Sequence, residues 1–183
     1  MKKAIQMTIC FTVLSLLVFS CRKETALTTD RVPPKVTLRI QGNGNDNTFE
    51  ANGAGMSPNG EYIYKENTRY NFTVTITDTS GLGQLIFKLD KSAAISEFTL
   101  NGAPAATDNS DDNEYSYAII AQRTDPYKSF VMTGNFLTGS NASSAPARIS
   151  VVGRDYLPNT TTINLNGSVH ANPPAGIFGW NPF

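Results

Sequence analysis

The densest group of oxygen ligands in the sequence is the acidic stretch from Asp108 to Glu114. Calcium prefers several oxygen ligands, and carboxylates that alternate along a loop can supply them. Asp108, Asp112 and Glu114 are therefore weak candidates for a metal site, although the stretch lacks the glycine that gives an EF-hand loop its sharp turn. A solvated loop that keeps neighbouring strand edges from pairing with other chains explains the same residues. We favour this second interpretation and expect no metal.

Catalytic chemistry has few candidate residues. Ser-His-Asp and Cys-His arrangements need a histidine, and the sequence has a single one, His170, close to Pro173 and Pro174. Paired carboxylates could serve glycoside hydrolysis. The carboxylates nearest the ends of predicted strands are more simply explained as solvated turn residues: Asp78, Asp90, Glu97 and Asp155. We expect no catalytic site, no enzyme activity and no cofactor.

The N-terminal segment has the pattern of a lipid attachment signal. Lys2 and Lys3 precede an apolar stretch at residues 9–19, which is shorter than the ~20 residues of a comfortable transmembrane helix. The stretch ends in Leu17-Val18-Phe19-Ser20-Cys21, which resembles a bacterial lipobox, where signal peptidase cuts before the cysteine. We expect a signal peptide over residues 1–20 and lipid on the Cys21 thiol. An ordinary secretory signal is the alternative.

Composition limits the partners of the remaining chain. Loss of Lys2 and Lys3 reduces the 15 basic residues to 13, against 15 acidic residues. No basic stripe remains, so we expect no nucleic acid partner. Of the two cysteines, Cys10 would be removed and Cys21 lipidated, so no disulfide is expected and stability must come from packing. The remaining length suits one domain.

The elements that position these residues are predicted to be β-strands. A tether over residues 21–34 ends in Pro33-Pro34 and leads to a sandwich over residues 35–168. Alternating apolar residues predict strands near Val36–Ile40, Phe72–Ile76, Leu85–Leu89, Phe98–Leu100, Tyr115–Ile119, Phe130–Met132, Ile149–Val151 and Ile163–Leu165. Turns are predicted at Ser80-Gly81, Asn101-Gly102, Thr133-Gly134-Asn135 and Pro158-Asn159. Residues 41–60 and 103–114 are predicted to be loops. The fold class is an antiparallel β-sandwich of about seven to nine strands.

Aromatic residues suggest two further possibilities. Sugar rings can stack on exposed tyrosines, and the candidates are Tyr62, Tyr64, Tyr70, Tyr115, Tyr117, Tyr127 and Tyr156. Half-buried strand tyrosines with a solvated hydroxyl are the alternative. The segment 169–183 is a C-terminal tail with four large apolar residues: Ile177, Phe178, Trp180 and Phe183. We expect this tail to pack back onto the sandwich rather than to dock into a partner.

Three segments resemble bacterial immunoglobulin-like domains. Val32–Leu38 is similar to their opening strand, and Thr77–Leu82 is similar to the Asp-and-Gly turn before a strand of the second sheet. Val151–Thr160 resembles their closing hairpin, with Pro158 in place of the usual glycine. The resemblance implies an immunoglobulin-like sandwich. The anchor suggests an envelope lipoprotein of the Bacteroidetes type, although Arg22-Lys23-Glu24 differs from the usual acidic sorting cluster.

Together these features predict a non-catalytic lipoprotein of the outer membrane, with one immunoglobulin-like binding or structural module. Its expected partners are the membrane, through the lipid on Cys21, and an envelope protein or a glycan. The alternative is a surface glycan-binding accessory protein of a polysaccharide-uptake system. The sequence leaves open which side of the outer membrane the domain faces.

Overall fold

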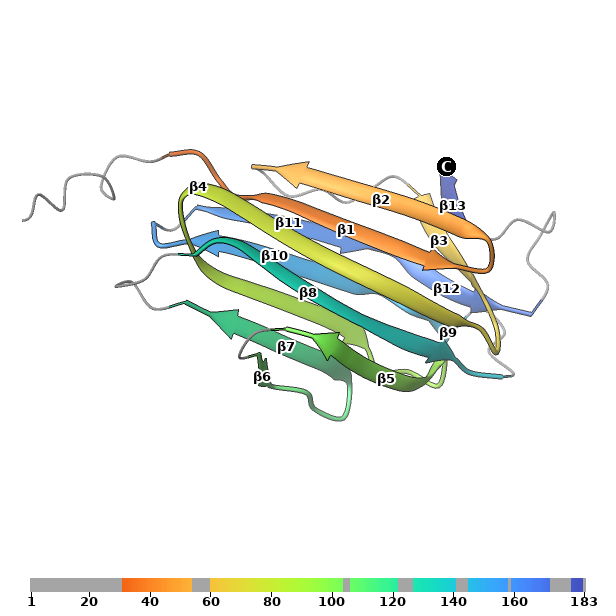
Figure 1. Ribbon diagram of the computed structural model, residues 1–183. Helices are drawn as coiled ribbons and strands as arrows, with labels where there is room; N and C mark the ends of the chain where they lie inside the picture. The colour runs from red at the N-terminus through yellow and green to blue at the C-terminus, as the bar shows by residue number, and fades with distance from the viewer. Residues whose placement is uncertain are drawn as a thin grey trace, which may run out of the picture. The chain divides into compact units, whose positions relative to one another are not determined.

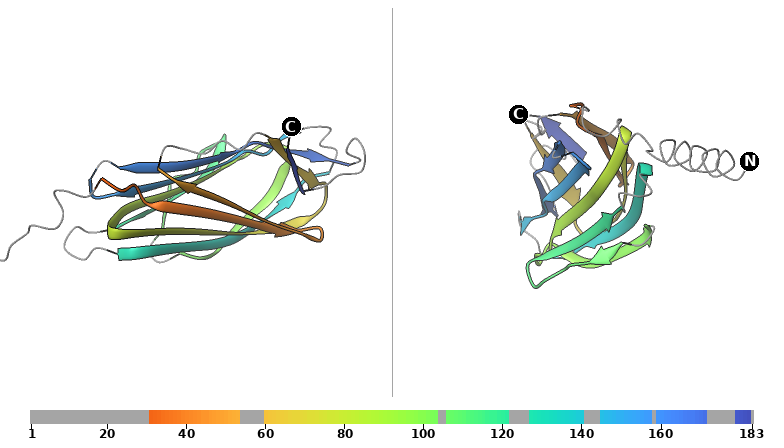
Figure 2. Two further views of the ribbon diagram at one scale, coloured as in Figure 1. Left: turned by 90° about the horizontal axis from the view of Figure 1, so that it is seen from above. Right: turned by 90° about the vertical axis from the view of Figure 1, so that its left-hand side faces the viewer.

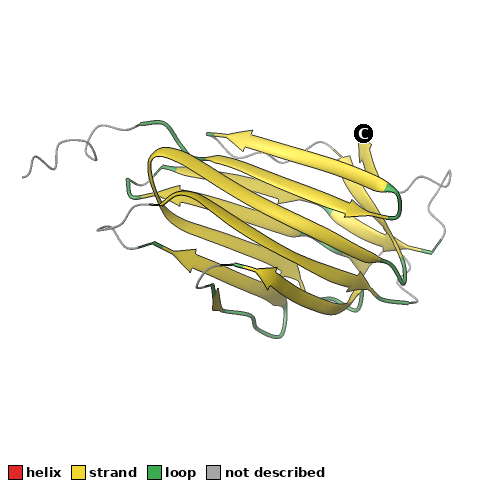
Figure 3. Cartoon of the chain, viewed as in Figure 1, coloured by secondary structure: helices red, strands yellow, loops and turns green. Residues whose placement is uncertain are grey.

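The computed structural model describes residues 31–53, 60–103, 106–121, 127–140, 145–157, 159–171 and 179–182. These residues contain no helix and form thirteen strands (Figures 1 and 3). They are β1 (Lys35–Gly42), β2 (Asn45–Asn52), β3 (Gly60–Lys65), β4 (Arg69–Asp90), β5 (Ile95–Gly102), β6 (Thr107–Asp108), β7 (Glu114–Ile120), β8 (Tyr127–Thr138), β9 (Ala145–Pro146), β10 (Ile149–Asp155), β11 (Thr160–Leu165), β12 (Gly167–His170) and β13 (Gly179–Pro182). The number of strands is larger than the predicted seven to nine, partly because four of the strands have only two to four residues. Within the described part of the chain, no helix is long and apolar enough to cross a membrane.

Alternating burial places the apolar side chains of the long strands in the core. In β1 the side chains of Val36, Leu38 and Ile40 are fully buried, and those between them are partly or largely exposed. Phe72 and Val74 follow the same pattern in β4. Successive side chains of a strand point to opposite faces, so a period of two buries one face. The strands predicted at these positions are confirmed.

β4 takes part in both layers of the sandwich. Its first half pairs with β8 over residues 69–77 and with β1 over residues 71–77. Its second half pairs with β10 over residues 82–89 and with β7 over residues 84–90, and Leu82 at the bend also pairs with Tyr127 of β8. The yellow-green ribbon doubles back between these halves (Figures 1 and 2). The rings of Phe72 and Phe87, one from each half, stack with centroids 4.4 Å apart and planes 6° apart. The halves therefore face each other across the core.

Two layers follow from this arrangement of β4. Layer 1 consists of β2, β1, the first half of β4, β8 and β5, and layer 2 consists of β11, β10, the second half of β4, β7 and β6. The described strand pairs within these layers are antiparallel. The chain is thus an all-β, immunoglobulin-like antiparallel β-sandwich, and the predicted fold class is confirmed.

Asp78 holds the bend between the two halves of β4. Its Oδ1 atom accepts hydrogen bonds from the N–H groups of Ser80 and Gly81, at 2.7 and 2.8 Å. Gly81 has a φ of 132°, a backbone conformation that residues with a side chain rarely adopt. The turn predicted at Ser80-Gly81 is confirmed, and the carboxylate of Asp78 is used to hold it.

A second aspartate holds the hairpin between β10 and β11. The Oδ1 atom of Asp155 accepts a hydrogen bond from the Asn159 N–H group at 3.1 Å, and its Oδ2 atom accepts one from Asn159 Nδ2 at 2.6 Å. The two strands pair from Ile149 with Leu165 to Arg154 with Thr160. The predicted closing hairpin is therefore present.

A second sheet has the strand order β13-β3-β12-β9. β12 pairs with β3 in parallel, whereas β13 pairs with β3 and β9 with β12 in antiparallel orientation. Strand pairing therefore continues past residue 168, and residues 179–182 of the tail pair their backbone with β3. This pairing agrees with the expected packing of the tail, while Ile177, Phe178 and Phe183 lie outside the described residues.

The prediction of a loop over residues 41–60 is wrong, because this segment contains β2, Asn45–Asn52. Asn43 and Gly44 form the turn before it, with φ values of 50° and 78°. A two-residue type I′ hairpin turn needs positive φ at both positions, and Asn-Gly is its commonest sequence. The Asn-Gly dipeptide was the signal that the prediction missed. Apolar alternation could not reveal β2, because the strand is mostly polar and Phe49 is its one large buried side chain.

The turn predicted at residues 133–135 is also wrong, because these residues lie inside β8. A Cβ atom on Gly134 would lie 2.5 Å from the ring of Phe72 and 2.6 Å from the carbonyl oxygen of Thr99. Glycine is needed here because a core ring and a neighbouring strand approach the backbone closely.

Candidate functional site

The acidic loop is organised by hydrogen bonds to its own backbone. Asp108 Oδ1 accepts a hydrogen bond from the Ser110 N–H group at 2.9 Å. Asp111 Oδ1 accepts hydrogen bonds from the N–H groups of Asn113 and Glu114, at 2.7 and 2.9 Å. Hydrogen bonding by Ser110 lowers the pKa of Asp108, and hydrogen bonding by the Asn113 backbone lowers the pKa of Asp111.

The three metal candidates do not form a site. Asp112 is exposed, and Glu114 Oε1 lies 2.5 Å from Lys88 Nζ on the neighbouring strand. In the described ranges, no group of three or more His, Cys, Asp or Glu side chains could hold a metal ion. The loop thus has the geometry of a self-contained turn rather than of a calcium cage.

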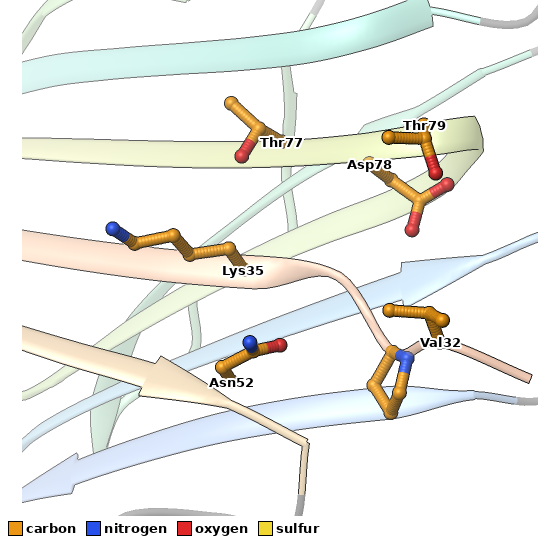
Figure 4. A pocket seen from close by; sticks show the side chains of 7 residues that line it. Val32, Lys35, Asn52, Thr77, Asp78 and Thr79 are labelled. Carbon is orange, nitrogen blue, oxygen red and sulfur yellow. The ribbon is translucent and has the colours of Figure 1, made fainter.

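A hollow of about 250 Å³ lies where the described chain begins (Figure 4). It is lined by Val32, Pro33, Lys35, Asn52, Thr77, Asp78 and Thr79. The Lys35 ammonium pairs with Glu50 at 2.9 Å, and the Asp78 carboxylate already accepts two backbone hydrogen bonds. The hollow therefore offers no free acid and base facing each other.

A second hollow, of about 220 Å³, lies on layer 2 among polar side chains. Its lining includes the Lys88–Glu114 pair and also Asp90 and Arg148. The Asp90 carboxylate accepts a hydrogen bond from the Arg148 N–H group at 3.3 Å. Both hollows are smaller than the ~300–1,000 Å³ of ordinary small-molecule sites. Neither has the size of an enclosed substrate pocket.

His170 makes one contact that the sequence did not suggest. Its Nε2 atom lies 2.7 Å from Ser168 Oγ, two residues earlier on β12. Hydrogen bonding between a serine and a histidine is the first requirement of a serine nucleophile. Ser168 is only 4% exposed, so a substrate cannot readily reach its hydroxyl. The pair fits a structural contact within the sheet.

Three of the seven candidate platform tyrosines, Tyr62, Tyr64 and Tyr70, are fully buried, so their rings offer no exposed face to a sugar. Tyr62 and Tyr64 of β3 have ring centroids 4.5 Å apart, and both pack edge-on against Tyr70 of β4, at 6.3 and 5.1 Å. The Tyr70 hydroxyl accepts a hydrogen bond from the Lys65 N–H group at 2.8 Å. The buried hydroxyls of Tyr62 and Tyr64 have no hydrogen-bond partner among the described residues.

Alkaline titration is expected to separate these buried tyrosines from the others. Burial raises the pKa of Tyr62, Tyr64 and Tyr70 above the ordinary value of about 10. The unfolded chain therefore loses these protons at lower pH than the native state, so stability should fall as pH rises above about 10. Ultraviolet absorbance should show these tyrosines ionising only on unfolding, whereas in denaturant all seven should titrate together. Reversible ionisation of all seven in the native protein would contradict the buried cluster.

An aromatic group remains partly exposed at the edge between β5 and β7. We call Phe98, Tyr115 and Tyr117 the aromatic seam. The Phe98 ring lies 4.8 Å from Tyr115 and 5.3 Å from Tyr117, at 17° to each. On its inner side Phe98 stacks on Phe87 at 6.0 Å, so the seam continues the core stacking to the surface. All three side chains are half-buried.

Polar groups border the aromatic seam. Lys91 Nζ lies 5.2 Å from the centre of the Tyr115 ring, within the distance of a cation–π contact. Asp108 lies opposite Tyr117 in the β6–β7 pair, and hydrogen bonding between the two contributes to the lowered pKa of Asp108. The spacing of Tyr115 and Tyr117 predicted that they share a strand face. Phe98 was missed, because only the packing of the layers places it against them.

Cys21 lies outside the described residues, so its lipidation stays a prediction.

Of the remaining candidate tyrosines, Tyr127 is 48% exposed and Tyr156 is half-buried. Leu82, at the bend of β4, pairs with Tyr127 and with Asp155, which directly precedes Tyr156. Tyr127 and Tyr156 therefore lie near this bend and not at the aromatic seam. The structure therefore divides the seven tyrosines among three regions.

No family model and no curated protein matches this chain. Among solved structures, it is similar to the sixth cohesin of scaffoldin B from Acetivibrio cellulolyticus, with 14% identity, a TM-score of 0.38, and coverage of 61% of this chain and 94% of the cohesin. It is also similar to a non-cellulosomal cohesin from Archaeoglobus fulgidus, with 12% identity, a TM-score of 0.33, and coverage of 73% and 91%. The fimbrial subunit MyfA from Yersinia enterocolitica has 10% identity, a TM-score of 0.32, and coverage of 72% and 97%. These scores are low, and the fold class stated above stands on the strand pairing of this chain.

Proposed function

We propose that this chain is a lipid-anchored protein of the bacterial outer membrane, whose immunoglobulin-like sandwich is a non-catalytic recognition module. The aromatic seam is the observation that carries the proposal, and we assign it as the contact surface. Its rings are half-buried and stacked, with Lys91 and Asp108 beside them. Recognition surfaces typically combine such aromatic groups with a polar rim.

The use of the polar side chains supports recognition over catalysis. The carboxylates of Asp78, Asp155 and Asp111 each accept hydrogen bonds within a turn. Glu114 is paired with Lys88, and Ser168 is buried beside His170. Groups committed to holding the backbone are poorly placed to exchange protons with a substrate, whereas a surface contact needs no such exchange.

The anchor rests on the lipobox-like sequence that ends in Cys21. Labelling cells with a tagged fatty acid tests it directly. We expect the wild-type protein to carry the label and the Cys21→Ser variant to lose it. Cys10→Ser is the matched control, because Cys10 lies in the segment expected to be removed. Label that persists in Cys21→Ser would overturn the lipoprotein proposal.

A glycan is the ligand class that the aromatic seam favours. Tyr115 and Tyr117 stack on Phe98 with their planes at 17° to it, and all three rings are half-buried, so part of the aromatic surface is left to contact the apolar face of a sugar ring. The role would then be that of a surface glycan-binding accessory protein in polysaccharide uptake. An envelope protein is the other class of ligand.

Glycan-array binding by residues 22–183 distinguishes these ligands, because the compact unit of the chain begins at Arg31. We expect Tyr117→Ala to abolish binding and Tyr127→Ala, which lies away from the seam, to preserve it. Binding that survives Tyr117→Ala would remove the seam from the proposal. Absence of any glycan ligand would favour an envelope protein, to be identified by photo-crosslinking from position 117.

A further inference from the structure

The two ends of the sandwich differ in the residues they display. We call the end where residues 31–35 join β1 the proximal end. Strand register places three rows of paired residues there. In layer 1, Thr77 lies between Lys35 and Ser129. Leu82 lies between Asp155 and Tyr127, and Gln84 lies between Arg154 and Ile120. The opposite, distal end carries the β1–β2 turn and the pairing of Asp90 with Glu114 (Figure 1).

Large apolar side chains are exposed mainly at the proximal end. The described residues include four such side chains: Val32 at 59%, Ile120 at 68%, Tyr127 at 48% and Val131 at 45%. Ile120 and Tyr127 end β7 and begin β8 beside the bend of β4, and Val32 precedes β1. Val131 instead lies on the outer face of layer 1, opposite Thr75.

The proximal end displays exposed cations. Arg31, Lys128 and Arg154 are exposed at the proximal end, and the four ion pairs seen among the described residues use other cations. The Lys128 ammonium also donates a hydrogen bond to the carbonyl oxygen of Thr79 at the bend of β4. The proximal carboxylates within the described ranges are occupied: Glu50 pairs with Lys35, while Asp78 and Asp155 are each 8% exposed and accept hydrogen bonds within turns. The distal end carries charges of both signs: Asp46 pairs with Arg39, Glu114 pairs with Lys88, and Asp90, Asp111 and Asp112 lie there with Lys91 and Arg148.

The length of the preceding chain limits how far this end can lie from an anchor. Cys21 and Arg31 are ten positions apart in the sequence. A fully extended chain spans at most ~3.3–3.6 Å per residue, so this segment reaches roughly 35 Å. Lipid on Cys21 would therefore hold the proximal end within roughly 35 Å of the bilayer.

We propose that the proximal end rests on the lipid surface. Ile120, Tyr127 and Val32 contact the interfacial layer, where an amphipathic tyrosine and apolar side chains are stable. The exposed cations Lys128 and Arg154 face anionic headgroups, which attract nearby basic residues. The distal end then points away from the membrane. The inference rests on the proposed lipid anchor at Cys21, which would hold the domain at the membrane in the cell. The lipid-contacting surface is nevertheless tested on protein without natural lipidation.

The test attaches the chain to a bilayer by chemistry. Residues 21–183 contain a single cysteine, because Cys10 lies upstream, so Cys21 can be coupled to a maleimide phospholipid. The bilayer is a nanodisc of phosphatidylethanolamine and phosphatidylglycerol that contains a gadolinium-chelating lipid. Paramagnetic broadening of backbone NMR signals then reports which residues lie near the lipid. We expect strong broadening at Ile120, Tyr127 and Arg154, and none at Asp112.

Variants assign this contact to individual side chains. Ile120→Ser combined with Tyr127→Ser should reduce the broadening at Arg154 to the weaker level that the tether alone produces. Val131→Ser is the matched control, because Val131 is also exposed but lies on the outer face of layer 1, and it should change nothing. Replacing phosphatidylglycerol with phosphatidylcholine, or adding salt, should weaken the broadening through the loss of charge attraction.

Other outcomes would overturn the proposal. Equal broadening at both ends would mean that the domain tumbles on its tether, and a maximum at the aromatic seam would assign the contact to another surface. A concentration-dependent dimer that the double variant abolishes would assign Ile120 and Tyr127 to a second copy. Proximal broadening in a chain whose native form carries no fatty-acid label would refute the anchor while retaining the lipid-contacting surface.

Discussion

Replacing Phe87 with alanine is expected to lower the free energy of unfolding by about 3–5 kcal/mol, as for other large aromatic residues removed from a core. Phe87 is fully buried in the second half of β4, and its ring stacks on Phe72 of the first half. Truncation would leave a cavity between the two layers, at the place where one strand belongs to both. Chemical denaturation, with the midpoint and slope fitted separately, measures the loss.

Two further variants test whether the loss comes from this cavity. Phe87→Leu keeps most of the apolar volume and should cost markedly less than alanine. Val131→Ala removes an apolar side chain that is 45% exposed, and its effect should stay within about 0.5 kcal/mol. If Phe87→Ala were as mild as Val131→Ala, the stacking across β4 would not hold the layers together.

Asp78→Ala is expected to destabilise the fold by about 1.5–3 kcal/mol, the usual range for hydrogen bonds to a charged group. Its carboxylate accepts hydrogen bonds from Ser80 and Gly81, and the Gly81 bond is buried. Alanine would leave both N–H groups without this acceptor at the bend of β4. Thermal and denaturant unfolding should both report the change.

The matched variant is Asp78→Asn, which keeps a side-chain oxygen at the same position. Asparagine forms the same kind of turn, so most of the stability should return. Asp112→Ala serves as a surface control, because Asp112 is exposed in the acidic loop. Equal destabilisation by alanine and asparagine would show that the charge of Asp78, rather than its hydrogen-bond geometry, holds the bend.

Strands with a clear apolar alternation were predictable because their pattern is local. Val36, Leu38 and Ile40 occupy one face at a period of two, and burial of that face needs no knowledge of the partner strand. The Asp78 bend and the Asp155 hairpin were also visible, since a short side chain caps its own turn. β2 escaped prediction because polar residues occupy most of its positions, and its pairing with β1 depends on the turn at Asn43-Gly44.

The candidate sites were less predictable than the strands. Tyrosines look alike in the sequence, whether they are buried like Tyr64 or border a surface seam like Tyr117. Gly134 was predicted in a turn because the approach of Phe72 to its backbone comes from an element more than sixty positions away. Asp111 and Asp112 of the acidic loop are exposed, whereas Thr107 and Asp108 form the short strand β6, and the hydrogen bonds of the loop depend on the folded turn.

The sequence by itself determined the all-β class, the position of most strands and the lipobox-like motif at Cys21, because each is written in neighbouring residues. Tertiary structure decided which side chains act together. It joined Phe98 to Tyr115 and Tyr117, buried Tyr62 and Tyr64, and gathered Ile120, Tyr127 and Arg154 at one end. The physical reason is that strand pairing and layer packing connect residues far apart in the chain, and local alternation carries no information about those partners.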